Sequence, residues 1–182
     1  SAFFANCEGF HGEACSIFAG PYTVTHHKST LLIAGQFSFY NAGSASNQSN
    51  HMYKLGPLHQ GILMRGAKTS SSSYLLWPSR VGPFNVVVGK HMANFDTATL
   101  PFSYVTTVDE HTTITPAMNL FTVGTRRDSE KWPKRDRRRD GDPLDLITFE
   151  LFNPHLLKLT LEGIDAMAAL AASTPKEKDF VI

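Results

Sequence analysis

The chain has 182 residues, of which 42% are hydrophobic and 18% charged, and its formal net charge is +1. This composition supports a packed core and excludes intrinsic disorder, and the near-neutral charge argues against the broad basic surface of a nucleic-acid-binding protein. Two cysteines without an apolar N-terminal leader argue against a secreted disulfide scaffold, so we expect a cytoplasmic protein. No apolar run reaches the roughly 20 residues that cross a bilayer, so we expect a soluble protein.

Residues 1–14 show no clear period, and we predict an irregular lead-in coil there. From Cys15 to Val87 every sixth residue can be aligned into one column, which predicts that these residues share one position in a repeating structure. A residue that is usually small follows four positions after each of them. Short fixed periods are typical of a parallel β-helix, whose coils all present the same positions to a narrow interior. We predict such a solenoid over about residues 5–105. The predicted inward column is Cys15, Pro21, His27, Ile33, Phe39, Ala45, His51, Pro57, Leu63, Thr69, Leu75, Val81 and Val87.

Two stretches add resemblances to known families. The segment Val81-Gly-Pro-Phe-Asn-Val-Val-Val-Gly89 resembles the hexapeptide repeat of left-handed β-helix acyltransferases. This resemblance implies an all-β, left-handed parallel β-helix with three hexads per coil, and hence roughly four coils. Residues 26–51, 53–61 and 131–136 together resemble an uncharacterised family of longer bacterial proteins with hexapeptide repeats. We therefore expect this chain to be part of a longer polypeptide.

The C-terminal part has different patterns. β-branched and aromatic stretches at 102–107 and 112–115 predict a hairpin that ends the solenoid. Leu157, Leu161, Ile164, Ala168 and Ala171 share one helical face, and Asn153-Pro154 is a good start, so we predict a helix over 154–172. A shorter helix is predicted over 142–152. We divide the chain into a β-helix at 1–107 and a part at 108–182 whose basic segment and helices pack on the solenoid.

The basic segment, residues 126–139, holds eight basic and three acidic residues and so carries +5, against −4 for the rest of the chain. Concentrated positive charge favours phosphate groups, although a solvated helix with internal ion pairs is an equal alternative. An indole flanked by cations could stack on a nucleotide base. No phosphate-binding glycine motif is present. The candidate substrate-binding residues are Asn47, Asn50, Lys54, Arg126, Arg127, Lys131, Trp132, Lys134 and Arg135.

Histidine is the first candidate for chemistry, because acyl transfer needs a base that is neutral near pH 7. The resemblance to hexapeptide acyltransferases implies a histidine in the groove between subunits of a trimer. The candidates are His51, His59, His26 and His27. The alternative is that the polar residues here have no catalytic role and only form hydrogen bonds with backbone groups at the corners of the coils. The chain lacks the His-x4-His pair of left-handed β-helix carbonic anhydrases, so we expect no metal.

These patterns lead to one functional hypothesis and one alternative. The hypothesis is a transferase that moves an acyl group, with acyl-coenzyme A as donor, to a sugar or nucleotide-sugar acceptor. The resemblance further implies a homotrimer. We expect the ligand to be a small sugar or a phosphate-containing molecule, and we expect binding to neither membranes nor nucleic acid. We also expect contact with the rest of a longer parent chain. The alternative is a non-catalytic β-helix module that binds a sugar or supports the catalytic part of that longer protein.

Overall fold

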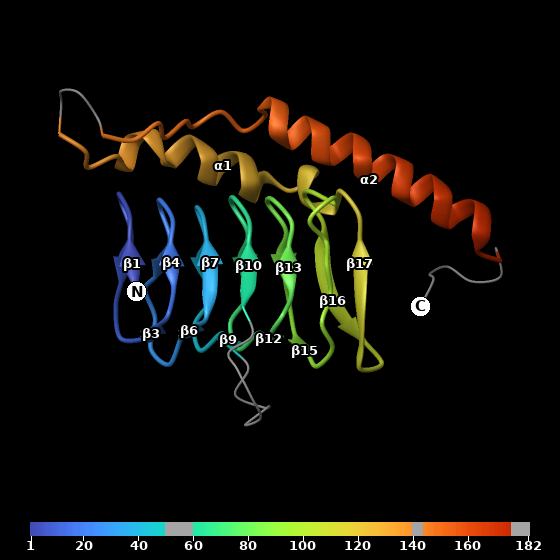
Figure 1. Ribbon diagram of the computed structural model, residues 1–182, viewed down its shortest axis with the longest axis horizontal. Helices are drawn as coiled ribbons and strands as arrows, with labels where there is room; N and C mark the ends of the chain where they lie inside the picture. Colours follow the sequence, from blue (N-terminus) through green and yellow to red (C-terminus); the bar gives the residue numbers. More distant parts are fainter. Residues whose placement is uncertain (50–59, 140–143, 176–182) are drawn as a thin grey trace.

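The computed structural model describes residues 1–49, 60–139 and 144–175. Short parallel strands wind into five coils whose sides form three sheets (Figure 1). The first sheet contains β1 (Ala2–Phe3), β4 (Phe18–Ala19), β7 (Gly35–Phe37), β10 (Gly61–Leu63) and β13 (Arg80–Val81). The second contains β2 (Glu8–Gly9), β5 (Val24–Thr25), β8 (Asn41–Ala42), β11 (Lys68–Thr69), β14 (Val86–Val87), β16 (Tyr104–Val108) and β17 (His111–Thr115). The third contains β3 (Glu13–Cys15), β6 (Leu31–Ile33), β9 (Asn47–Ser49), β12 (Tyr74–Leu76) and β15 (Lys90–His91). The predicted left-handed parallel β-helix with a C-terminal α-helical segment is confirmed.

The core is a stack of like positions from successive coils. In the first sheet Ala19, Phe37, Leu63 and Val81 lie one above the other and are all buried. In the third sheet the stack includes Gln48 and His91, which are also fully buried. Each coil therefore adds one inward residue per sheet, and the interior is filled by side chains.

The predicted six-residue phase is regular only from Leu63 to Val87, where every sixth residue is buried. Before this stretch the inward residues are Ala19, Thr25, Leu32, Phe37, Ala42 and Gln48, at spacings of five to seven. The prediction of an unbroken phase from Cys15 is therefore wrong. His27, predicted to point inward, is exposed, and Phe39 lies at a corner. The corners between strands differ in length, so the number of residues from one inward position to the next varies. The strands of each sheet nevertheless stay in register.

Other predicted elements have mixed outcomes. Residues 1–14 are not irregular, because β1, β2 and most of β3 form a first coil that pairs with the next one. The hairpin is confirmed as β16 and β17, which pair antiparallel. The helix predicted over 142–152 is wrong for its described part, since residues 144–150 have no helical structure. Among the described residues, no helix is long and apolar enough to cross a membrane.

The long predicted helix is confirmed as α2 (Pro154–Ser173). The side chain of Asn153 accepts a hydrogen bond from the Leu156 backbone N–H at 2.9 Å, and Pro154 occupies the first turn. This is the expected helix start, since the cap satisfies a donor that the helix leaves unpaired. Its buried residues are Leu156, Leu159 and Gly163, which do not belong to the apolar face identified from the sequence.

One corner of the solenoid carries a ladder of aromatic side chains, which we call the corner ladder: Tyr22, Phe39, Phe84 and Phe102. Each has a positive φ between 48° and 59°, so its side chain points out of the coil. The rings stack in pairs, with centroids 5.0 Å apart for Tyr22 and Phe39 and 5.1 Å apart for Phe84 and Phe102. Aromatic contacts of this kind add to the stability gained by burial.

The C-terminal segment covers this ladder. It contains η1 (Met118–Leu120), α1 (Val123–Lys131), η2 (Pro133–Arg135) and α2. Both α1 and α2 lie along the same edge of the solenoid, and the end of α2 extends past β17 (Figure 1). Phe84, Phe102 and Leu156 form a second small core, against which Trp132 and Leu151 pack. The corner ladder therefore joins the solenoid to its helical cover.

Gly66 occupies the ladder between Phe39 and Phe84, at φ +75°, and a Cβ there would lie 2.4 Å from the Phe84 ring. We predict that Gly66→Ala lowers the free energy of unfolding by about 1–3 kcal/mol, because the ring must move and the φ is strained. Denaturant unfolding measures the change. Gly124→Ala on α1 is the control, because its Cβ would meet nothing closer than 4.0 Å and should leave stability unchanged or slightly raised. Equal stability of the two variants would contradict the prediction.

Candidate functional site

The floor of the candidate site is the outer face of the second sheet. Glu8, Val24, Asn41 and Lys68 occupy the same register position on four neighbouring strands. Because side chains alternate across a strand, the residue after each of them points inward, and these four point outward. The winding of the solenoid therefore brings residues that are far apart in the sequence into one row.

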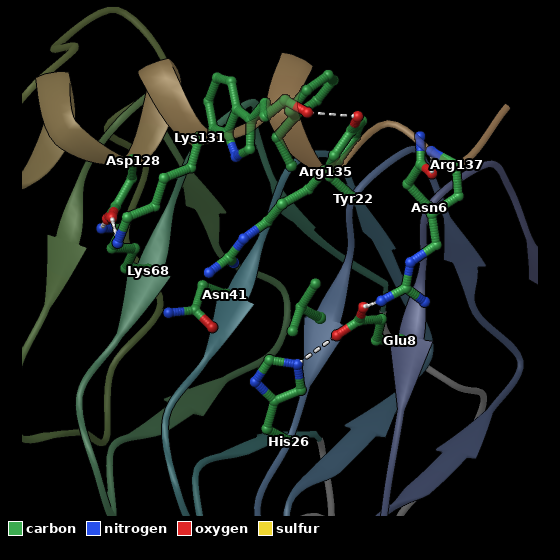
Figure 2. A pocket seen from close by; sticks show the side chains of 13 residues that line it. Asn6, Glu8, Tyr22, His26, Asn41, Lys68, Asp128, Lys131, Arg135 and Arg137 are labelled. Carbon is green, nitrogen blue, oxygen red and sulfur yellow. Dashed lines mark hydrogen bonds and ion pairs between the residues drawn. The ribbon is translucent and has the colours of Figure 1, made fainter.

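The roof is formed by α1, η2 and the residues that follow. Asp128, Lys131, Arg135 and Arg137 face the floor across a cavity of about 270 Å³ (Figure 2). Trp132 also lines this cavity. A second cavity of about 490 Å³ opens beside it. It is lined by Glu8, His26, Lys134, Arg135, Asp136 and Arg137. Because four residues line both, we treat the two as one groove.

His26 and Glu8 form a dyad at the junction of the two cavities. The distance from His26 Nε2 to Glu8 Oε2 is 2.5 Å, and Glu8 Oε1 accepts a hydrogen bond from Arg137 at 2.6 Å. The hydrogen bond to His26, followed by the charge of Arg137, lowers the pKa of Glu8, so the carboxylate stays ionised. An ionised Glu8 favours the tautomer with hydrogen on Nε2, which leaves Nδ1 of His26 able to accept a proton.

Cations gather at the other end of the groove. Lys68 on the floor forms an ion pair with Asp128 of α1, and Lys131 lies 3.7 Å from the same carboxylate. Burial, followed by the charges of Arg127 and Lys131, lowers the pKa of Lys68 to about 8. The side chain of Arg135 extends from the roof toward Asn41 (Figure 2). Lys131 and Arg135 thus bring positive charge that the carboxylates of the groove only partly balance.

The stretch after η2 is anchored to the first coil by side-chain hydrogen bonds. Asn6 donates to Asp136 Oδ1 at 2.9 Å and accepts from the Arg137 backbone N–H at 2.8 Å. Arg138 bonds both oxygens of Asp136 and also Asp145. The contact with Arg138, and then the bond from Asn6, holds the pKa of Asp136 well below its usual range. These contacts hold the backbone at Arg137 against the first coil, so that its side chain lies beside Glu8.

Trp132 holds the roof to the corner ladder. Its ring lies edge-on to Phe39 with centroids 4.5 Å apart, and its backbone carbonyl accepts a hydrogen bond from the Tyr22 hydroxyl at 2.8 Å. The guanidinium of Arg65 lies 4.1 Å from the centre of the Phe39 ring and 5.3 Å from that of Trp132. The predicted role of Trp132, stacking on a base, competes with these packing contacts.

The structure brings five of the residues proposed from the sequence to the groove: His26, Lys131, Trp132, Lys134 and Arg135. Arg126 and Arg127 lie on exposed parts of α1, where Arg126 pairs with Glu130 at 2.9 Å. Asn47 belongs to the third sheet, and His27 lines neither cavity. Four candidates lie outside the described residues: His51, His59, Asn50 and Lys54.

Sequence reasoning did not identify Asn6, Glu8 and Lys68, and it placed Asp128 and Arg137 only within the basic segment. Glu8 and Lys68 share a register position with Asn41. This row could be found from the sequence only if the number of residues in each coil were known. Among residues 1–49, 60–139 and 144–175, no cluster of three metal-ligating side chains occurs.

A comparison of the chain with protein families finds a matching model. It is described as Domain of unknown function (DUF4954), and it covers residues 1–171. No curated protein and no solved structure matches the chain significantly.

Because Asn6 makes both contacts at φ 60°, Asn6→Gly would remove them without straining the backbone. We predict that trypsin then cleaves the chain near Arg137 and Arg138 about tenfold faster, since loss of two hydrogen bonds raises the population of the released segment. The control is Ser29→Gly, at another corner with φ 63°. A cleavage rate in Asn6→Gly equal to that of the control would show that Asn6 does not hold the segment.

Proposed function

The chain belongs to the DUF4954 family, and we propose that it is a transferase that binds a phosphate-containing substrate in the groove. In this proposal an acyl group moves from acyl-coenzyme A to a hydroxyl or amine of a sugar or nucleotide-sugar acceptor, and His26 is the general base. The observation that carries the proposal is the His26–Glu8 contact at the junction of two cavities that are both lined by cations.

The charges of the groove support binding of phosphate. Lys68, Lys131, Arg135 and Arg137 line the first cavity against the carboxylates of Glu8 and Asp128 alone, which leaves an excess of positive charge. The second cavity adds the cation of Lys134 and the carboxylate of Asp136, which already pairs with Arg138. Coenzyme A and nucleotide-sugars both carry phosphates, which guanidinium groups bind through charge-assisted hydrogen bonds.

The dyad supports the chemical step. With its Nε2–H donated to Glu8, His26 can accept a proton on Nδ1 from the acceptor hydroxyl as the oxygen attacks the thioester carbonyl. The carbon–sulfur bond then breaks, and the proton passes from His26 to the leaving thiolate. Ionised Glu8 stabilises the imidazolium between these steps.

A non-catalytic binding module is the second candidate, and one observation favours it. Arg137 shares the Glu8 carboxylate with His26 and lies 2.6 Å from it. A carboxylate that already pairs with arginine stabilises a protonated histidine less, which weakens the base. In this alternative the groove binds a phosphate-containing sugar for another part of a longer protein.

A thermal-shift screen of acyl-coenzyme A compounds and nucleotide-sugars tests binding first. A ligand at 100 times its dissociation constant adds about 2.7 kcal/mol to the stability of the native state. We expect acetyl-coenzyme A to raise the melting temperature, and Arg135→Gln to reduce that shift. If no phosphate-containing compound shifts the wild-type protein, both candidate functions fail.

For a compound that binds and is turned over, we predict that His26→Gln lowers kcat by about 10²- to 10⁴-fold while KM changes little, because glutamine cannot accept the proton. Steady-state kinetics with detection of free thiol measures this. His27→Gln is the matched control, since the adjacent ring is exposed and lines neither cavity. Unchanged turnover in His26→Gln would rule out His26 as the base. Ligand binding without any turnover would favour the binding module.

The pH dependence of binding gives a separate prediction from Lys68. With a pKa of about 8, Lys68 loses its charge as the pH rises from 7 to 9, so affinity for acetyl-coenzyme A should fall by about tenfold over that range. Calorimetry at several pH values measures it. Lys68→Met should bind weakly at every pH and lose this dependence. Arg135→Gln should bind weakly but keep it, because Lys68 is still present. A wild-type affinity that is constant between pH 7 and 9 would contradict the prediction.

A further inference from the structure

The exposed face of α2 carries an apolar stripe that the solenoid does not cover, which we call the α2 seam: Leu157, Leu161, Ile164, Ala168 and Ala171. Leu157, Leu161 and Ile164 are 51%, 63% and 52% exposed. A different face of the helix contacts the solenoid through Leu156, Leu159 and Gly163, which are all buried. The helix therefore has two apolar faces and uses only one of them within the chain.

The spacing of the α2 seam indicates what kind of partner covers it. Its residues follow one another at intervals of four, three, four and three, which is the heptad pattern of a coiled-coil interface. Such a seam packs against another helix with the same pattern, because side chains of each helix fit between those of the other. From Leu157 to Ala171 the seam spans 15 residues and is about 21 Å long, or roughly four turns. The kind of partner is thus an apolar helix of similar length.

The flanking charges indicate which helix this is. Lys158 and Asp165 both lie on the same side of the seam, each one position after a seam residue, and both are exposed. In an antiparallel pair of helices, equivalent flanking positions of the two chains face each other. Lys158 of one copy would then face Asp165 of the second copy, and the same pair would form again across the two-fold axis. The seam is thus complementary to itself in charge as well as in shape.

We propose that two copies of this chain associate through α2, in an antiparallel pair of helices around a two-fold axis. A two-fold interface closes on itself and uses the same surface of both copies, as this seam requires. The α2 helix extends past β17, so its C-terminal half stands clear of the solenoid and can accept a partner (Figure 1). A seam of four turns makes a small interface, so the dimer forms and dissociates with concentration.

Charge reversal provides the test. Sedimentation velocity of the 182-residue chain between about 1 and 500 µM should show a monomer–dimer equilibrium. K158D and D165K should each raise the dissociation constant by about tenfold, because two symmetric ion pairs become repulsive. The double variant K158D/D165K should restore it to within about threefold. A mixture of the two single variants should associate more strongly than either alone, since opposite charges then face each other.

Two further variants complete the test. L161K/I164K should be monomeric with an unchanged circular dichroism spectrum, because both side chains are exposed within one chain. R126D is the matched control: like Lys158 with Glu162, Arg126 makes an (i, i+4) pair on an exposed helix, and its loss should not alter association. A wild-type chain that stays monomeric at 500 µM overturns the proposal, including the case in which the seam binds another part of a longer protein. A dimer or trimer that tolerates L161K/I164K also overturns it.

Discussion

The contact between Trp132 and the corner ladder is the interaction on which the groove depends. The inward side chains of the coils fill the solenoid, and the corner rings give the covering segment an apolar surface to pack on. Trp132 lies against Phe39, and the Tyr22 hydroxyl donates to its carbonyl, which fixes both the position and the direction of the chain as it leaves α1. The roof consequently stands over the outer face of the second sheet, and the space between them becomes a cavity.

The electrostatics of the groove follow from that placement. The net charge of the chain is +1, but the charge is unevenly distributed. The basic segment faces a floor that contributes only one carboxylate to the cavity, that of Glu8. Asp128 is shared between Lys68 and Lys131, and Glu8 is shared between His26 and Arg137. Arg135 has no carboxylate partner among the ion pairs of the described residues, and it extends toward Asn41 (Figure 2). An anion entering the groove would therefore meet an arginine that no acidic side chain already holds.

The sequence predicts the architecture well and the site only in part, for reasons that particular residues make clear. Leu63 to Val87 follow the six-residue period because their corners have equal length, and this stretch alone indicates a β-helix. The shorter and longer corners before it move His27 outward, and that shift cannot be read from the period. The concentrated charge at 126–139 identified Lys131 and Arg135, whereas Glu8 needed knowledge of which strands are neighbours. For α2 the pattern found the seam and missed the contact face, because Gly163 packs closely against Thr99 without a side chain.

The site joins the first coil to the residues that follow η2, and this couples binding to folding. Asn6 and Glu8 belong to the first coil, whereas Asp136 and Arg137 follow η2, about 130 residues later. Each of these contacts closes a long loop, whose entropic cost is met only when the coils between them are already stacked. The groove consequently depends on the stacking of all the coils that lie between these two segments. A ligand that binds both His26 and Arg135 would stabilise the contact between the first coil and the basic segment. Because this contact exists only while the coils between them are stacked, the ligand would stabilise the folded solenoid as well.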